Sequence, residues 1–331
     1  MITIIIIIVF VIGYIAIAFE HSLQLNKAAS ALITGVLCWT LYILQSNSSD
    51  KVNEELLHHL GEIAFILFFL LGAMTIVELI DSHNGFDIIT QKIKTSSKAS
   101  LLLIIVSITF FLSALLDNLT TAIVMTSLCT KILKEKEDRL WFAGMIIIAA
   151  NAGGAWSPLG DVTTTMLWIG KQITALNIMK QLILPSIAAC IIPTMIVAYR
   201  FKGIKVAAIP ESICSPSEKK EGRIVFFAGI GLLIFVPVFK TITHLPPFIG
   251  MLLALGFMWI ITTVIHKSKE QEIAERFTVA RALQKIDTPS ILFFLGILLA
   301  VSALQSVGLL KELASFLSNT FKNNPKTIPI L

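Results

Sequence analysis

Apolar residues form long runs along the chain, and short polar segments separate them. A helix of about 20 residues crosses the ~30 Å hydrocarbon core of a bilayer, and most of these runs approach that length. The polar segments are too short to form a separate soluble domain, so we predict an all-α polytopic membrane protein with one membrane domain over 1–331. The predicted spans cover residues 2–19, 28–45, 63–80, 100–131, 142–169, 178–199, 224–240, 247–265 and 289–308.

Two of the runs carry polar residues at their centres. SALLDNLTT interrupts the run over 100–131, and NAGGAWSPLGDVTTT interrupts the run over 142–169. Inside hydrocarbon, non-helical backbone survives only where it is buried in protein or lines a wet cavity, because every N–H and C=O needs a partner. The breaks therefore predict an ion or substrate site at mid-membrane depth, built from freed carbonyls and a new helix N-terminus. The residues expected to break the second helix are Gly153, Gly154, Pro158 and Gly160.

Each break also holds one acid, Asp117 in the first and Asp161 in the second. A carboxylate is costly to bury in a membrane and indicates function there. It holds either a proton or a cation, and this competition is the chemical basis of an exchanger. Neighbouring oxygen ligands suit a hard alkali cation. They are Asn118, Thr120, Thr121, Asn151, Ser157, Thr163 and Thr164.

These residues also have simpler interpretations, which the sequence leaves open. Asp161 could cap the half-helix that follows it through free N–H groups. Asp117 and Asn118 could form an ordinary loop tip. The hydroxyls of Thr163–Thr165 could bond back to their own helix.

Composition and charge agree with a membrane protein. The chain is 56% hydrophobic and 14% charged, with a mean hydropathy of +0.85, whereas about a quarter of the residues in a soluble domain are charged. Four cysteines lie without C-x-x-C spacing, which predicts neither disulfides nor a zinc site. Cofactors are not expected.

Basic residues predict the orientation. We place the N-terminus outside, let 100–131 enter and leave on one side as a re-entrant hairpin, and let 142–169 cross once. Most Lys and Arg then lie in cytoplasmic segments, as the positive-inside rule requires. The net charge of +5 is thus explained by the membrane topology, and it predicts no nucleic-acid partner. We expect a multi-pass protein of a bacterial inner membrane, surrounded by lipid. The cytoplasmic basic residues lie at 27, 92–98, 131–139, 200–223 and 267–285.

The chain contains a candidate internal repeat. ILFFLLGAMTIVELI at 66–80 is similar to ILFFLGILLAVSALQ at 291–305. In the predicted orientation the two copies cross in opposite directions, as in secondary transporters with inverted repeats. The first repeat would cover 63–199 and the second would begin within 289–331. Counterparts of the two breaks would lie beyond Leu331, so we expect an incomplete second repeat in a truncated form of a longer protein.

The two motifs resemble the signature segments of a known family. SALLDNLTTAIVM (113–125) and NAGGAWSPLGDVTTTMLW (151–168) are similar to those of NhaD-type sodium/proton antiporters. Their superfamily also contains citrate and dicarboxylate carriers. The resemblance covers about 60–310 and implies two inverted repeats, each with a re-entrant hairpin and a broken helix. It also implies a homodimer with a mobile transport domain.

The resemblance further implies which ions are handled and where. Na+, with Li+ as a second candidate, would exchange for H+ at Asp117 and Asp161, assisted by Asn118 and Thr163. One alternative is an anion carrier for citrate, dicarboxylate or arsenite. A second is an intramembrane aspartyl protease, because PLGD at 158–161 approaches the G-x-G-D pattern of those enzymes, although proline stands in place of glycine. A third is an inactive truncated remnant, since the family builds its ion site from both repeats.

Overall fold

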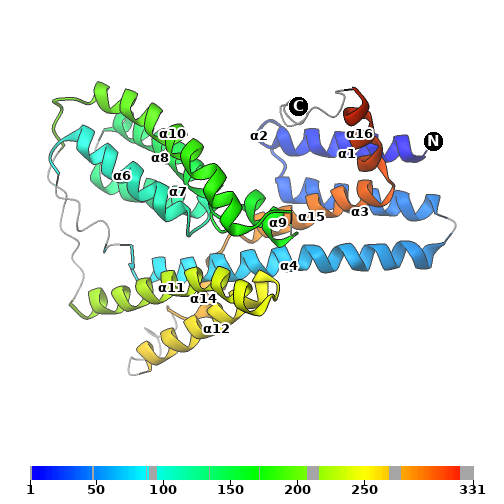
Figure 1. Cartoon of the computed structure of the whole chain (residues 1–331). Helices are drawn as coiled ribbons and strands as arrows, with labels where there is room; N and C mark the ends of the chain where they lie inside the picture. The colour runs from blue at the N-terminus through cyan, green and yellow to red at the C-terminus, as the bar shows by residue number, and fades with distance from the viewer. Residues whose placement is uncertain are drawn as a thin grey trace. The chain divides into compact units, whose positions relative to one another are not determined.

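The computed structural model describes residues 2–46, 48–86, 88, 95–133, 135–170, 172–206, 216–267 and 277–320. These residues are almost entirely helical, and they contain an isolated β-bridge between Ser97 and Lys205 rather than strands (Figure 1). Six of the described helices are long and apolar enough to cross a membrane. The predicted all-α polytopic membrane fold is therefore confirmed. The six helices are α3 (Lys27–Gln45), α4 (Ser49–Ser82), α10 (Ala175–Arg200), α11 (Pro216–Thr243), α12 (Pro247–His266) and α15 (Thr288–Ser306).

The chain divides into two compact units. The first comprises Met1–Leu67 and Asp287–Leu331, and the second comprises Phe68–Ile286. Helix α4 begins in the first unit and ends in the second. Its first turns were expected to lie in a loop, because they are polar, but the segment VNEELLHHL is rich in helix formers and continues the helix.

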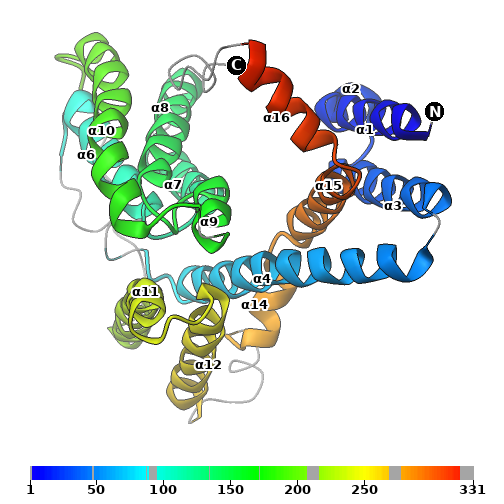
Figure 2. The same ribbon diagram turned by 45° about the vertical axis from the view of Figure 1, so that its right-hand side comes forward.

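In the first unit, α3 packs along α15, beside α1 (Ile2–Ala18) (Figure 2). The contact is close because glycines face each other: a Cβ on Gly35 would lie 2.7 Å from the carbonyl oxygen of Gly296. The indole of Trp39 donates to the carbonyl oxygen of Leu299 at 2.9 Å. Small residues thus let two helices approach, and a hydrogen bond fixes their register. The unit also contains α2 (Glu20–Leu23) and α16 (Leu309–Thr320).

The second unit contains both predicted interruptions. The run over 100–131 forms α6 (Lys98–Ser113) and α7 (Asn118–Ile132). The run over 142–169 forms α8 (Lys136–Ala155) and α9 (Val162–Ile169). Both interruptions are confirmed. A short helix, α14 (Val279–Lys285), completes the described part of this unit.

Helices α6 and α7 form a hairpin against α8, beside α10 (Figures 1 and 2). Lys98 pairs with Asp138 at 2.6 Å, so α6 and α8 begin at the same end. Arg139 Nε donates to the carbonyl oxygen of Leu133 at 2.7 Å, so α7 ends where α8 begins. The chain therefore reverses direction between α6 and α7, and the tip of the hairpin lies at the far end of α8. That this hairpin is re-entrant in the membrane remains a prediction.

The glycines of the second break differ from expectation. Gly153 and Gly154 were predicted to break the helix but lie in the last turn of α8, and the non-helical stretch covers 156–161. A Cβ on Gly153 would collide with the backbone of Phe110, and one on Gly154 with the backbone of Gly160. These two glycines therefore permit close backbone contact, whereas Pro158 and Gly160 lie in the break itself.

Two buried histidines meet at the C-terminal ends of α4 and α12. His83 Nε2 lies 2.8 Å from His266 Nε2, and His83 Nδ1 lies 2.6 Å from the carbonyl oxygen of Leu79. The ring of Phe277 stacks on His266 with centroids 4.8 Å apart. Because the His83 Nδ1–H donates to a carbonyl, the neutral ring accepts at Nε2 from His266. This bond connects the C-terminal end of α4 to that of α12, and the ring of Phe277 packs on the pair.

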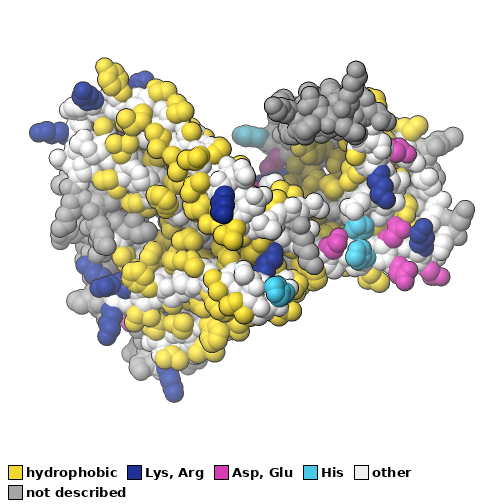
Figure 3. Space-filling model, in the orientation of Figure 1, with side chains coloured by type: hydrophobic (Ala, Val, Ile, Leu, Met, Phe, Trp, Pro, Cys, Tyr) yellow, Lys and Arg dark blue, Asp and Glu magenta, His cyan; other side chains and the backbone are white. Residues whose placement is uncertain are grey.

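Hydrophobic side chains cover much of the surface of α10 and α11 in the face drawn in Figure 3, and Lys and Arg lie mostly towards helix ends. Many exposed side chains of these helices are large and apolar, such as Ile196 on α10 and Phe227 on α11. In water such a surface would aggregate, whereas hydrocarbon solvates it. The surface agrees with a multi-pass membrane protein.

Candidate ion-binding site

The two helix breaks contact each other directly. Ser157 donates its hydroxyl to the carbonyl oxygen of Ala114, and Ser113 donates to that of Ala150 at 2.6 Å. A Cβ on Gly160 would collide with the carbonyl oxygen of Ser113. The tip of the hairpin and the break after α8 are thus joined by buried hydrogen bonds and by bare backbone contact.

Asp117 caps the N-terminus of α7. Its Oδ1 accepts from the backbone N–H of Thr120 at 2.8 Å, and its Oδ2 accepts from the Thr120 hydroxyl at 2.5 Å. A carboxylate at a helix N-terminus is stabilised by free N–H groups and by the helix dipole. In the hydrogen bonds described, the carboxylate of Asp117 therefore accepts from a backbone N–H and a hydroxyl rather than from a basic side chain.

Asp161 caps α9 in the same manner. Its Oδ2 accepts from the backbone N–H of Thr163 at 3.0 Å. Its Oδ1 accepts from Asn118 Nδ2, on the other break, at 3.1 Å. The capping interpretation of Asp161 is therefore correct, and Asp117, for which a loop tip was the alternative, caps a helix as well. Capping does not exclude ion binding, because an ionised carboxylate offers about four lone-pair positions and each acid uses two.

Asn118 connects the site across the two breaks. Its Nδ2 donates to Asp161 and also to Asn151 Oδ1 at 3.0 Å. Asn151 in turn donates to the carbonyl oxygen of Ile147 at 2.8 Å. Because the amide nitrogen of Asn118 is engaged with oxygens, its Oδ1 is the atom that remains to ligate a cation.

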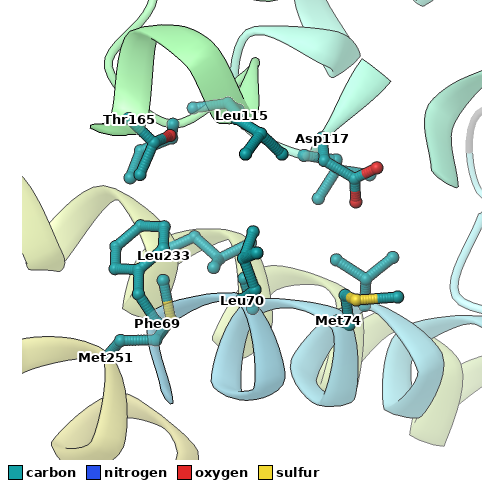
Figure 4. Close-up of a pocket in the computed structure, with 13 residues that line it drawn as sticks. Phe69, Leu70, Met74, Leu115, Asp117, Thr165, Leu233 and Met251 are labelled. Atoms are coloured by element: carbon teal, nitrogen blue, oxygen red, sulfur yellow. The ribbon is translucent and has the colours of Figure 1, made fainter. Parts of the chain in front are cut away.

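A cavity of about 20 Å³ adjoins Asp117 on the side of α4. Figure 4 shows Leu115 and Asp117 facing Leu70 and Met74 across it, with Thr165 at the other end. A space of this size holds about one water molecule. Asp117 is the charged residue in the lining, which otherwise consists of Phe69, Leu70, Ala73, Met74, Val77, Leu115, Leu116, Leu159, Val162, Thr165, Leu233 and Met251.

Helix α9 is fixed at both ends. At its start, the Thr165 hydroxyl donates to the carbonyl oxygens of Pro158 and Asp161, each at 2.9 Å. At its end, Lys240 Nζ donates to the carbonyl oxygen of Trp168 at 3.0 Å and lies 3.9 Å from the centroid of its ring. A cation at a helix C-terminus complements the dipole. This short half-helix therefore carries a negative group at its N-terminus and a positive group at its C-terminus.

The predicted residues divide into three groups. One group consists of Asn118, Asn151, Asp161 and the backbone of Thr163, which hydrogen bonds join across the two breaks, and of Asp117 with Thr120, which form the adjacent cap of α7. Ser157 binds the other break, and Thr164 bonds the carbonyl oxygen of Ala155 at 3.5 Å. Thr121 is buried, and its hydroxyl has no hydrogen-bond partner among the described residues.

Sequence reasoning missed two residues of this region. Ser113 was available to it, because a hydroxyl opens the motif SALLDNLTT. Lys240 lies at the end of an apolar span, and nothing in the sequence relates it to Trp168, 72 residues earlier.

Comparison with known proteins identifies the family. The family model described as "Citrate transporter" matches residues 1–330. The chain belongs to the citrate transporter family. This family membership and the apolar helices together show that the chain is a multi-pass membrane protein from a family of transporters.

Several relatives of this chain are named as sodium/proton antiporters. Sodium/proton antiporter 1 of Arabidopsis thaliana is 45% identical over 95% of this chain and 54% of the relative. Sodium/proton antiporter 2 of the same plant is 42% identical over 95% of this chain and 75% of the relative. The Na+/H+ antiporter NhaD of Vibrio cholerae is 30% identical over 91% of this chain and 68% of the relative. The chain thus spans about half the length of the first of these relatives and about three quarters or less of the others. The resemblance to the NhaD-type antiporters is confirmed.

Proposed function

We propose that the protein is a secondary active transporter that exchanges Na+ for H+ across a membrane. The observation that carries the proposal is the joining of two interrupted helices by Asn118, which places Asp161 beside the hairpin tip that holds Asp117. The sodium/proton antiporters among the relatives support the choice of ions.

The chemistry follows from the state of the two carboxylates. When ionised, Asp117 and Asp161 keep lone pairs that a hard cation can share with neutral oxygens such as Asn118 Oδ1. When protonated, a carboxyl group loses its charge and the cation loses its main attraction. Each site therefore holds a proton or Na+ in turn, and access from alternate sides of the membrane converts the competition into exchange.

The geometry favours a cation over an anion such as citrate. An anionic substrate would bind at free helix N-termini, but Asp117 and Asp161 already occupy those of α7 and α9 with negative charge. The cavity beside Asp117 is about 20 Å³, whereas pockets for organic ligands span about 300–1,000 Å³. Li+ is the second candidate among cations of suitable size.

The geometry also disfavours an aspartyl protease. Such an enzyme needs two carboxylates that share one proton directly. In the described residues, Asp161 is hydrogen-bonded to Asn118, and Asp117 to Thr120. A direct bond between the two carboxylates, which a proteolytic dyad requires, is not among the hydrogen bonds of the described residues.

We further propose the membrane placement that the charge distribution favours, with an external N-terminus in a bacterial inner membrane, and a homodimer as the assembly. Cysteine labelling from outside intact cells, at a single cysteine placed near Ser49 in a cysteine-free background, tests the orientation. Labelling at this site is expected, because from an external N-terminus α1 crosses inward and α3 crosses back outward, which places the α3–α4 connection outside. If a cysteine at Lys202 were labelled from outside and one near Ser49 were not, the protein would have the opposite orientation.

Reconstitution tests the proposed activity. The purified chain is placed in vesicles with an acidic interior, reported by a pH-sensitive dye. Addition of NaCl is expected to dequench the dye, because Na+ enters as H+ leaves, whereas choline chloride and empty vesicles give no change. Absence of Na+-dependent dequenching would refute exchange by this chain. Uptake of labelled citrate in place of dequenching would establish the anion carrier.

A further inference from the structure

The hydroxyl of Thr121 is buried without a partner. The residue is 0% exposed, and its Oγ1 makes no hydrogen bond among the described residues. A buried polar atom of this kind is unfavourable and uncommon in native proteins, and it indicates a water or ion that completes the site.

The other buried threonines of the described residues make a hydrogen bond that Thr121 does not make. Each donates its hydroxyl to a backbone carbonyl, in most cases the one four residues earlier in its helix. Thr121 could bond in the same way to the carbonyl oxygen of Asp117, but it does not. The bonded set is Thr34, Thr75, Thr109, Thr164, Thr165, Thr194 and Thr262.

The position of Thr121 on α7 directs it towards the helix breaks. Cα–Cβ bonds tilt towards the N-terminus of a helix, and the N-terminus of α7 is the hairpin tip. At about 100° per residue, Thr121 lies between Asp117 and Asn118 around the helix axis, one turn further on. On the other side, Met125 and Cys129 continue the same buried face with apolar groups.

The surrounding chemistry suits one kind of ligand. Asp117 lies one turn earlier on the same helix, and its neighbour Asn118 bonds Asp161 across the breaks. Carboxylates and the neutral oxygens of an amide and a hydroxyl are the donors that hard cations prefer. We propose that Thr121 Oγ1 is a ligand of the transported alkali cation. This inference rests on the proposed exchange function. It adds to the cation site a neutral ligand that lies one helical turn from the hairpin tip.

A matched set of variants tests the assignment. Thr121→Val removes the hydroxyl at nearly constant volume, and Thr121→Ser keeps it. Thr109→Val, on the neighbouring helix α6, removes a hydroxyl that is equally buried but bonded to the carbonyl oxygen of Ile105 at 2.7 Å. Each variant is measured for the Na+ concentration that gives half-maximal dequenching, for maximal rate, and for melting temperature in NaCl and in choline chloride.

The expected result is a rise of at least ~10-fold in the half-maximal Na+ concentration for Thr121→Val, equivalent to one lost ligand. Thr121→Ser and Thr109→Val should remain within ~2-fold of the parent, which is less than 0.5 kcal/mol. The stabilisation of the parent by NaCl relative to choline chloride should be lost in Thr121→Val, because only a bound ligand raises the melting temperature by mass action.

Two results overturn the assignment. A structural or water-binding role predicts that Thr121→Val leaves the Na+ dependence unchanged, while the melting temperature in choline chloride rises or stays constant. Absence of stabilisation of the parent by NaCl would also overturn it. If the parent fails to exchange ions but NaCl stabilises it, and Thr121→Val abolishes that effect, the cation site stands and the exchange function fails.

Discussion

Asn118 on the hairpin and Asp161 after the second break are joined by a hydrogen bond of 3.1 Å between Nδ2 and Oδ1. The bond connects the N-terminus of α7 to that of α9, so a change of charge at Asp161 changes the strength of a hydrogen bond that the hairpin makes. In the exchange proposed above, we expect a proton or cation bound at Asp161 to alter this hydrogen bond and with it the position of the hairpin tip.

Loss of this connection should impair exchange. Asn118→Ala removes the bonds to both Asp161 and Asn151, and we expect the half-maximal Na+ concentration to rise by at least ~10-fold, the equivalent of about 1.4 kcal/mol. The dequenching assay measures it. Asn177→Ala, at an exposed position on α10, is the control. Unchanged Na+ dependence in Asn118→Ala would show that the connection has no part in ion binding.

Replacing Asp117 and Asp161 by asparagine separates the role of each side chain as a helix cap from the role of its negative charge. Asn caps a helix about as well as Asp, so Asp117→Asn and Asp161→Asn should keep the melting temperature and abolish exchange. The corresponding alanine variants lose the cap as well and should be less stable by about 1 kcal/mol. Thermal unfolding and dequenching are measured on the same preparations. Exchange retained in both Asn variants would restrict these acids to a capping role.

The glycines of α8 predict opposite effects of the same substitution. Gly153→Ala places a methyl group against the backbone of Phe110 and should destabilise the protein strongly, since backbone cannot move aside cheaply. Gly144→Ala, in the same helix, meets nothing within 4 Å and should be neutral or stabilising by up to about 1 kcal/mol. Melting temperatures in detergent test the contrast. Equal effects at the two positions would contradict the close packing of α8 on α6.

The buried histidine pair should contribute to stability. His83→Ala removes the partner of His266 Nε2 and should cost about 1–3 kcal/mol, the usual penalty for disrupting a buried hydrogen bond. His58→Ala, on α4, which ends at the residue before His83, has a side chain that is 72% exposed; it is the control and should change stability by less than about 0.5 kcal/mol. Comparable melting temperatures in the two variants would show that the pair is not a stabilising contact.

Sequence patterns were sufficient for the apolar helices and for the existence of both breaks. Long apolar runs specify membrane helices, and the cluster of polar residues and glycines around Pro158 specifies an interruption, whereas the single prolines Pro185 and Pro237 lie inside continuous helices. The start of α4 at Ser49 was missed, because hydropathy reports burial in lipid and not helix propensity.

Tertiary relationships were beyond these patterns. Gly153 looks like a helix breaker in the sequence, and its packing role becomes apparent only when Phe110, 43 residues earlier, lies against it. The bond of Asn118 to Asp161 also spans 43 residues. The partnerless hydroxyl of Thr121 is likewise a property of three-dimensional surroundings, since Thr120 and Thr121 are equivalent in sequence.

The contact of bare backbone at Gly153, Gly154 and Gly160 also limits how the protein can move. The hydrogen bonds of Ser113 and Ser157 hold the hairpin tip and the broken helix together at this contact. In the exchange proposed above, we therefore expect a motion that exposes the carboxylates to the opposite compartment to carry both elements as one body, with the bending in the connections that surround them.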